Sequence, residues 1–364
     1  MMKFSTSLLV LVLFFTFTGI AQSIEVNPTL MGEFTEYGID VNGDGILTVQ
    51  EAASHTKLVI RNYNITEFSC ITAFTNLKHF DCSGLSLTSL DLSKNTKLHY
   101  LDCSRNFLSQ LDLSHNPLLD TVYCKTNNLA QINLSNVSKL KFLDISSNAL
   151  TSINLTEAIA LENLLCTSNQ LTSVNTTNNT ALINFWAFNN QITQFNFTNN
   201  VKLKQALLFN NQVSFLEINN LDNLEELYCN KNILTTLSIF NTTHLKILNA
   251  SSNLNLMQIC VEDSNTAIQN GFIKDSQTQW AQNCTLGLGD TKDMAKESFF
   301  PNPATDHITL GSQMIEATID DLIGKKINTY YSQYIKINDL PAGIYLLKLT
   351  NKQGKQTIQK LIIE

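Results

Sequence analysis

Eight cysteines carry the most reactive side chains of this 364-residue chain. Thiols form disulfides, bind metals or act as nucleophiles, and each use requires a characteristic spacing. Five of them recur at one position of a 21-residue period, namely Cys82, Cys103, Cys124, Cys166 and Cys229. A metal ladder is the disfavoured alternative, because no histidine or second cysteine stands at ligand spacing. We predict that the five are small buried apolar side chains, and that Cys70 packs inward in the first coil.

Cys260 and Cys284 differ from the others because they flank a segment outside the repeats, residues 261–283. We predict a disulfide between them that closes the C-terminal cap. A loop of this length contributes about 3 kcal/mol to stability.

An oxygen-rich loop over residues 40–51 offers a different chemistry, the binding of a hard cation. Its candidate ligands are Asp40, Asn42, Asp44, the carbonyl of Ile46, Thr48 and Glu51. Gly45 permits a sharp turn between them. The spacing resembles the EF-hand calcium loop at every ligand position, and this resemblance implies one structural calcium ion. The alternative is a decayed loop that only caps the neighbouring domain.

A repeat fills the middle of the chain and must position any binding surface. Leucine recurs every 21 residues, at Leu77, Leu98, Leu119, Leu140, Leu161, Leu182, Leu203, Leu224 and Leu245. Apolar or cysteine residues follow three and five positions later, and an asparagine follows eight positions later from Asn106 to Asn253. This pattern resembles the leucine-rich repeat family. The resemblance implies a solenoid of about ten coils, counting an irregular first coil near His55, with a parallel β-sheet on the concave face.

Residues on either side of the second inward position point away from the core, because side chains alternate along a strand. The N-terminal half of these two columns is mostly small or acidic, apart from Tyr123, which we count among the candidate ligand-binding residues. Further along, the columns become apolar, and adjacent coils unite one patch: Leu165, Trp186, Phe188, Leu207, Phe209 and Tyr228. Exposed apolar patches usually mark interaction sites. We predict ligand binding here; the alternatives are self-association and rings that merely cover the sheet.

Composition and motifs disfavour two functional classes. The net charge is −7 and only 15% of residues are charged, whereas nucleic acids and anionic membranes require clustered Lys and Arg. The histidines are scattered and accompany no recurrent nucleophile, and no glycine-rich phosphate loop exists. We therefore expect neither nucleic-acid binding nor enzymatic activity.

The two ends of the chain predict an export route. Residues 1–21 have a charged start, a short apolar run and small residues before a cut after Ala21, which is typical of a signal peptide. The apolar run is short for a transmembrane anchor. Near the C-terminus stand the segments FFPNPA (299–304), DDLIGKK (320–326) and LPAGIY (340–345). They resemble the C-terminal sorting domain (Por-type) of the type IX secretion system of Bacteroidota. That resemblance implies a small β-sandwich, recognised by the secretion machinery, that directs the protein across the outer membrane.

These observations divide the chain into five expected segments. They are a signal peptide (1–21), an N-terminal cap with the EF-hand-like loop (22–54), the leucine-rich repeat domain with its C-terminal cap (55–285), a linker (286–297) and the sorting domain (298–364). The expected function is binding of an extracellular protein or glycan through the concave face, on the cell surface or after release. The alternative is a structural or adhesion component that assembles with itself.

Overall fold

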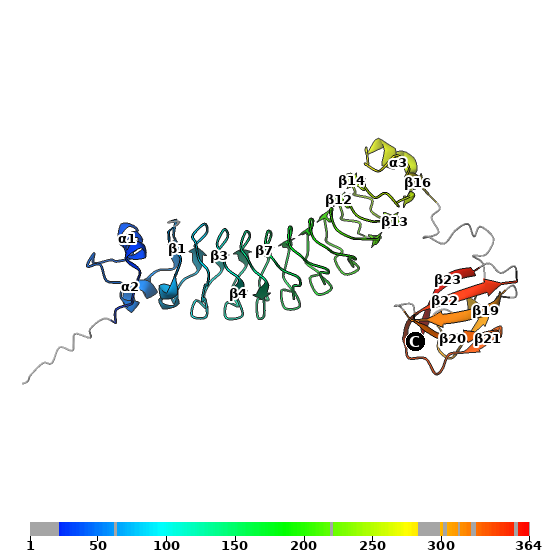
Figure 1. The fold of residues 1–364 in the computed structure, drawn as a ribbon, viewed down its shortest axis with the longest axis horizontal. Coiled ribbons are helices and arrows are strands. Elements are labelled where there is room, and N and C mark those ends of the chain that lie inside the picture. The colour runs from blue at the N-terminus through cyan, green and yellow to red at the C-terminus, as the bar shows by residue number, and fades with distance from the viewer. Residues whose placement is uncertain are drawn as a thin grey trace, which may run out of the picture. The chain divides into compact units, whose positions relative to one another are not determined.

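The computed structural model describes residues 22–61, 64–218, 221–282, 299–300, 304–311, 314–321, 325–352 and 356–363. The chain divides into two compact units, Met1–Gln282 and Asn283–Glu364, which are treated separately below (Figure 1). The predicted signal peptide and the predicted linker 286–297 lie outside the described residues.

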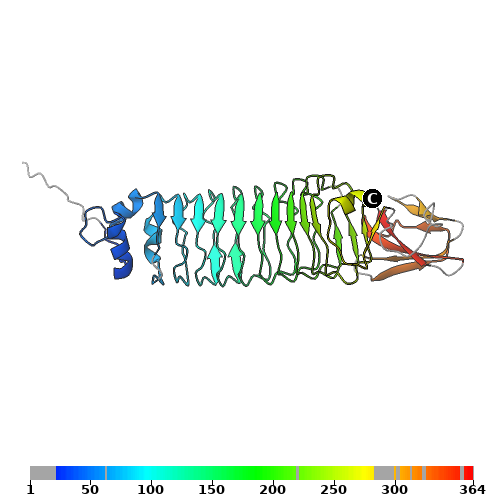
Figure 2. The same ribbon diagram turned by 90° about the horizontal axis from the view of Figure 1, so that it is seen from above.

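The first unit is a parallel β-solenoid whose main sheet contains ten strands, one from each coil. In spatial order they are β1 (Lys57–Val59), β2 (His79–Asp81), β3 (Tyr100–Asp102), β5 (Thr121–Tyr123), β7 (Phe142–Asp144), β8 (Asn163–Leu165), β9 (Asn184–Trp186), β10 (Gln205–Leu207), β12 (Glu226–Tyr228) and β14 (Ile247–Asn249). Figure 2 shows them side by side, and Figure 1 shows the solenoid bending toward this sheet. The predicted leucine-rich repeat solenoid of about ten coils is therefore confirmed.

Shorter sheets line the opposite, convex face. One pairs β4 (Gln110–Asp112) with β6 (Gln131–Asn133). The other contains β11 (Phe215–Glu217), β13 (Thr236–Ser238), β15 (Gln258–Cys260) and β16 (Gln279–Ala281). Between the two faces lies one continuous core of leucine, isoleucine, phenylalanine and cysteine, in which the repeated leucines are almost fully buried. The fixed 21-residue period places the same inward positions on top of one another.

The repeated asparagines bind each coil to the one before it. Asn127 shows the pattern: its Nδ2 donates to the carbonyls of Cys103 at 3.0 Å and Cys124 at 3.1 Å. Its Oδ1 accepts the backbone N–H of Leu108 at 3.0 Å. The side chain is only 8% exposed, so the backbone groups it satisfies have no access to water.

The residue before each of these asparagines has a positive φ, between 53° and 58°. These residues are Arg105, Thr126, Ser147, Ser168, Asn189, Asn210, Lys231 and Ser252. None is glycine, so the turn adopts a backbone conformation that costs free energy for an L-residue. The asparagine hydrogen bonds that follow hold the chain in this turn.

Both ends of the solenoid are covered. At the N-terminal end lie α1 (Pro28–Glu36), α2 (Val49–Ser54) and the 3-10 helix η1 (Ser69–Ala73), and Phe34 of α1 packs against Phe68 and Phe74. At the C-terminal end, α3 (Ser264–Gln269) follows β15. There the Asp275 carboxylate accepts the N–H groups of Ser252 and Asn253, both at 2.8 Å. In earlier coils such turn N–H groups donate to the next coil, so Asp275 takes the place of a further coil.

The second unit contains two antiparallel sheets around a separate apolar core. One consists of β17 (Phe299–Phe300), β18 (His307–Leu310) and β21 (Tyr334–Lys336). The other has the order β20 (Lys326–Tyr330), β19 (Met314–Asp320), β22 (Gly343–Asn351) and β23 (Gln356–Ile363). Inward residues such as Ile308, Ile319 and Leu347 are fully buried. The predicted small C-terminal β-domain is present.

The asparagine ladder predicts a large difference between two neighbouring residues. We expect Asn127→Ala to lower the free energy of unfolding by about 1–3 kcal/mol, because buried backbone groups lose their partners. Asn128→Ala is the matched control, since the Asn128 side chain is exposed. Urea unfolding followed by circular dichroism measures both variants. Equal stability of the two would contradict the role given to the ladder.

Candidate functional site

The outward surface of the main sheet consists of three columns of side chains. In β9, for example, Phe185 is fully buried while Asn184 and Trp186 are partly exposed, and Phe188 follows as the third outward residue. The sequence identified the second and third columns. It missed the first, which contains His79, Tyr100, Thr121, Phe142, Asn163, Asn184, Gln205, Glu226 and Ile247. The same 21-residue period carries this column, so counting one residue before the inward position would have found it.

The six residues of the predicted apolar patch do lie together, and we call them the C-terminal patch. Leu165 pairs in register with Trp186, Trp186 with Leu207, and Leu207 with Tyr228. In the third column Phe188 and Phe209 stack with ring centroids 4.3 Å apart and planes inclined by 9°. All six side chains are half-buried, so each keeps surface that a partner can cover.

A chain of amide hydrogen bonds fixes one edge of the C-terminal patch. Trp186 Nε1 donates to Gln205 Oε1, and Gln205 Nε2 donates to Glu226 Oε2 at 2.8 Å. The indole orientation is thereby set by neighbouring coils. A pre-oriented aromatic side chain loses little conformational entropy on binding, which favours its use as an anchor.

The N-terminal half of the concave face is more aromatic than the two columns identified in the sequence suggest. His79 stacks on Tyr100 with centroids 4.2 Å apart, and Tyr123 packs between Tyr100 at 5.9 Å and Phe142 at 4.8 Å. Three of these four rings belong to the missed column. Tyr123, predicted as a ligand-binding residue, belongs to this row and not to the C-terminal patch.

Acidic residues accompany the aromatic row. Asp81 and Asp102 are adjacent in register, and Asp144 lies two strands further on. Burial favours a higher pKa for Asp81, but hydrogen bonds from Arg61 and Ser83 outweigh it and lower the pKa. Burial, together with the negative charges of Asp102 and Asp81, raises the pKa of Tyr100 to about 12. The carboxylates of Asp81 and Asp102 therefore lie close to the ring of Tyr100.

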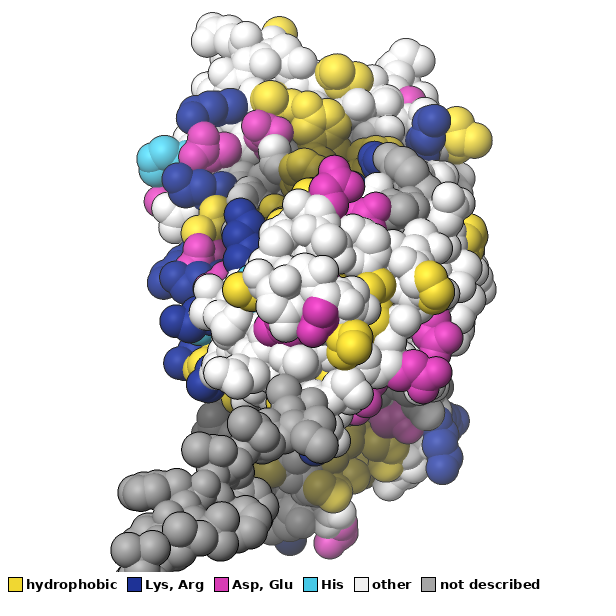
Figure 3. Space-filling model, turned by 90° about the vertical axis from the view of Figure 1, so that its left-hand side faces the viewer, with side chains coloured by type: hydrophobic (Ala, Val, Ile, Leu, Met, Phe, Trp, Pro, Cys, Tyr) yellow, Lys and Arg dark blue, Asp and Glu magenta, His cyan; other side chains and the backbone are white. Residues whose placement is uncertain are grey.

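Some charges on the flank of the solenoid form ion pairs between neighbouring coils. Lys141 lies 3.3 Å from Glu162, and Glu225 pairs with both Lys204 and Lys246. Figure 3 shows basic and acidic side chains mingled along one flank of the molecule. These pairs link one coil to the next at the surface, where an exposed ion pair contributes little to stability.

The predicted calcium ligands lie between the end of α1 and the first turn of α2, which contains Glu51, and most of them accept hydrogen bonds from the backbone there. The Asp40 carboxylate, only 4% exposed, accepts the N–H groups of Gly43 and Gly45, each at 2.9 Å. Asn42 and Asp44 accept the N–H groups two residues further on. Gly45 has a φ of 77°, which a side chain would disfavour.

Glu51 closes the other end of this loop. Its carboxylate accepts the backbone N–H of Thr48 at 2.9 Å, the Thr48 hydroxyl at 2.8 Å and the Val41 N–H at 3.2 Å. These bonds, led by the one from the Thr48 backbone, lower the pKa of Glu51. Across the described ranges, no three His, Cys, Asp or Glu side chains gather closely enough to hold a metal ion. Calcium binding stays a prediction.

The cysteine column is buried as predicted. Cys82, Cys103, Cys124, Cys166 and Cys229 are at most 1% exposed, and they and Cys70 are free thiols. Burial raises the pKa of Cys70 and Cys229 to about 12 and that of the other four still further above the ordinary value. Cys260 is buried in β15, and Cys284 lies outside the described residues, so their disulfide stays a prediction.

Comparison with protein families gives one match. Residues 298–364 match the family described as "Secretion system C-terminal sorting domain". The match indicates export across the outer membrane, to the cell surface or the extracellular space, with the secretion machinery as a partner of this tail. In the part of the chain that the structure describes, no helix is long and apolar enough to span a bilayer.

Solved structures share the fold. The functional domain of InlJ from Listeria monocytogenes, which includes a cysteine ladder, is 19% identical with a TM-score of 0.57, and the likeness covers 88% of this chain and 93% of that one. The leucine-rich repeat domain of APL1B is 20% identical with a TM-score of 0.50, covering 70% and 72%. No curated protein matches the sequence. At such identities the likeness concerns the fold alone, and the chain is a repeat protein that carries a sorting tail.

The buried thiols lead to a simple prediction, because thiol reagents attack the thiolate and the pKa of all six described free thiols is raised. We expect none of these six to react in the folded protein at pH 8. After unfolding without a reductant, six thiols should react, and after reduction all eight. A quantitative thiol assay measures each count. Eight reactive thiols before reduction would contradict the predicted disulfide between Cys260 and Cys284.

Proposed function

We propose that the solenoid is a non-catalytic recognition module that binds an extracellular protein or glycan through its concave face. The C-terminal patch supplies the anchors Trp186, Phe188, Phe209 and Tyr228. The observation that carries this proposal is the continuity of the patch: in the second column, four successive strands from β8 to β12 expose Leu165, Trp186, Leu207 and Tyr228 in register. Of the other strands from β2 to β14, all but β5, with Tyr123, carry Asp or Asn in that column.

Two further observations support the choice of this face. A solenoid buries its apolar residues between its sheets, so large apolar side chains on the outward columns add little to the core. The hydrogen bonds from Trp186 through Gln205 to Glu226 hold the largest ring in a fixed orientation. A surface prepared in this way suits binding better than mere coverage of the sheet.

Self-assembly is the second candidate, because the same patch can be buried against another copy of the chain. It would make the protein a structural or adhesion component of the surface to which the tail directs it. Sedimentation of the purified chain over a wide concentration range distinguishes the two. A size that grows with concentration favours self-assembly, whereas a constant monomer favours a foreign ligand.

The binding proposal is tested by replacing the four anchors together, as Trp186→Ala, Phe188→Ala, Phe209→Ala and Tyr228→Ala. We expect at least tenfold weaker binding to any extracellular protein or polysaccharide that the wild type binds, since one anchor residue commonly contributes about 2 kcal/mol. Arrays of such molecules, read with the labelled full-length chain, provide the measurement.

The matched control replaces four exposed apolar residues elsewhere on the solenoid, Phe107, Ile159, Val201 and Ile233, by alanine. Both variants must keep the far-ultraviolet circular dichroism of the wild type. Equal binding by the anchor variant and this control would refute the assignment of the C-terminal patch.

We also propose that the loop over residues 40–51 holds one structural calcium ion that stiffens the N-terminal cap. The support is the order of oxygen donors in a turn that Gly45 makes possible. Asp40, Asn42, Asp44, Thr48, Glu51 and the Ile46 carbonyl would hold the ion, replacing some of the backbone hydrogen bonds described above. Because the cap shields the apolar end of the solenoid, its order bears on the whole array.

Calcium should raise the melting temperature of the wild-type protein relative to the protein in a chelator. A ligand at one hundred times its dissociation constant stabilises the folded state by about 2.7 kcal/mol. We expect Glu51→Ala to abolish the effect and Glu36→Ala, an exposed glutamate at the end of α1, to leave it intact. Identical melting curves of the wild type with calcium and with chelator would count against the ion.

A further inference from the structure

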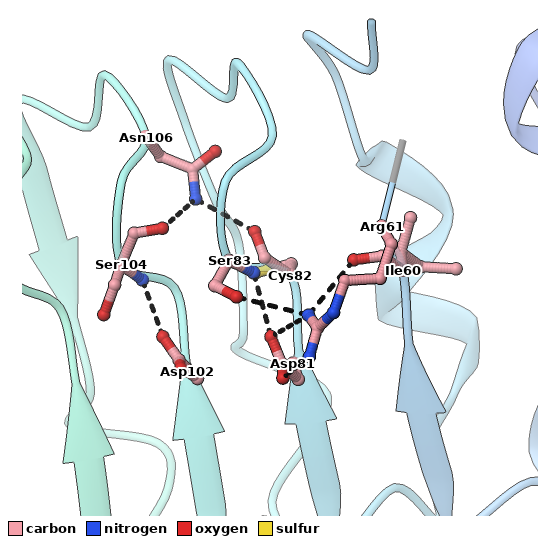
Figure 4. A network of polar contacts seen from close by, with 8 residues as sticks. All are labelled: Ile60, Arg61, Asp81, Cys82, Ser83, Asp102, Ser104 and Asn106. Carbon is pink, nitrogen blue, oxygen red and sulfur yellow. Dashed lines mark hydrogen bonds and ion pairs between the residues drawn. The ribbon is translucent and has the colours of Figure 1, made fainter. Parts of the chain in front are cut away.

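The first two coils contain an internal example of arginine recognition (Figure 4). Arg61 Nη1 donates to Asp81 Oδ1 at 2.6 Å and to Ser83 Oγ at 3.2 Å, and Nη2 donates to Asp81 Oδ2. The Ser83 N–H in turn donates to Asp81 Oδ1 at 3.0 Å, which orients the carboxylate. One aspartate and one serine, two residues apart on the outer face of the sheet, thus hold a guanidinium group.

The next coil repeats the same two residues without the arginine. Asp102 pairs in register with Asp81, and the Ser104 N–H donates to Asp102 Oδ1 at 2.9 Å. Among the described residues Asp102 forms no ion pair. The Ser104 hydroxyl is buried, in a residue only 3% exposed, and has no hydrogen-bond partner in the structure.

The reason for this difference lies in the third outward column. The cation that pairs with an aspartate comes from the preceding coil: Arg61 serves Asp81, and Lys125 lies 3.4 Å from Asp144. For Asp102 the corresponding position is Ser83, which is short and neutral. Within the described ranges, Asp102 is therefore the one aspartate on the outer face of the main sheet that forms no ion pair of its own. Arg61, which is bound to Asp81, lies near enough for the Asp102 charge to raise its pKa.

Aromatic rings flank this carboxylate. Tyr100 lies two residues before it on β3, Tyr123 is its register partner on β5, and the two rings are 5.9 Å apart. A guanidinium group next to Asp102 would lie beside these rings, and arginine stacks readily on aromatic faces. The pKa of Tyr100 is raised first by its burial and then by the negative charges of Asp102 and Asp81, so both carboxylates lie close to this ring.

We propose that Asp102 and Ser104 form a binding site for an arginine side chain of a partner protein. The Asp102 carboxylate accepts the guanidinium fork, as Asp81 does with Arg61. The Ser104 hydroxyl reaches the position of its Ser83 counterpart by rotation about its Cα–Cβ bond. Tyr100 and Tyr123 provide the walls.

This inference rests on the proposed function and narrows the partner from a protein or glycan to an arginine-bearing protein. The arginine site on β3 and Trp186 on β9 are four strand spacings apart, which is roughly 19 Å at about 4.8 Å per strand. The partner would present an arginine and an apolar cluster at that separation.

The test uses the full-length chain with two neutralised amino-acid probes, N-acetyl-arginine amide and N-acetyl-citrulline amide. Citrulline has nearly the same shape as arginine but no charge. The backbone amide resonances of the isotope-labelled protein report where each probe binds. We expect arginine to shift the Ser104 amide, and citrulline to bind at least tenfold more weakly.

Three variants localise the effect. Asp102→Asn should weaken arginine binding at least tenfold while retaining the fold, because Asn249 already accepts the Ser251 N–H at the corresponding place in β14. Ser83→Arg should weaken arginine binding to a similar degree, because the new side chain, in the preceding coil, would form an ion pair with the Asp102 carboxylate. Asp112→Asn on the convex face makes the same charge change as Asp102→Asn and should leave binding unchanged.

Equal affinity for arginine and citrulline would overturn the inference, and so would unchanged arginine binding by Asp102→Asn. The variant that lacks the four anchors of the C-terminal patch distinguishes failure of this inference from failure of the proposed function. It should still bind the arginine probe at Asp102 and Ser104. Loss of arginine binding in Asp102→Asn, but not in the anchor variant, would support the site independently of the patch.

Discussion

The asparagine side chain in the turn after each main strand is the interaction on which the rest of the solenoid depends. In a stack of three-residue strands, the turns lie inside the protein and their backbone groups cannot reach water. Asn127 satisfies groups of its own coil and of the preceding one, and the same geometry recurs from Asn106 to Asn253. A carboxylate would bring an unpaired charge into this place, and a hydroxyl would lack the second donor, so the amide suits it best.

Because the amide and the inward apolar column hold each coil, the outward columns are free to differ from coil to coil. The concave face uses this freedom in two ways. Toward the N-terminus it pairs carboxylates with aromatic rings, and toward the C-terminus it presents Trp186, Phe188, Phe209 and Tyr228. The inward cysteines share one core column with Ala187 and Leu208, and they fill it with small side chains that leave no polar group in need of a partner.

Most of this structure could be predicted from the sequence, because residues 21 positions apart occupy equivalent places in successive coils. The inward leucines, the buried cysteines and the continuity of the C-terminal patch all follow from the 21-residue step. The ion pair of Arg61 was not predicted, because Arg61 lies in the irregular first coil, where Leu58 pairs with Phe80 at a step of 22 residues. Hydrogen bonds between side chains, such as that from Trp186 to Gln205, were not predicted either, because they depend on rotamers that a repeat pattern does not specify. The loop ligands were located by spacing, yet their hydrogen bonds to the backbone were not foreseeable.

Asp275 gives the array a defined end that does not depend on its length. Its carboxylate receives the two N–H groups that an eleventh coil would otherwise accept, while the helices at the other end cover the first strand. Interior coils contact only their neighbours, so whole 21-residue units can be gained or lost between these two ends without disturbing either. Duplication of a coil between β3 and β9 would move the arginine site and the aromatic anchors apart by one strand spacing. Evolution or a protein engineer can thus change the distance between two sites on the concave face in steps of one coil.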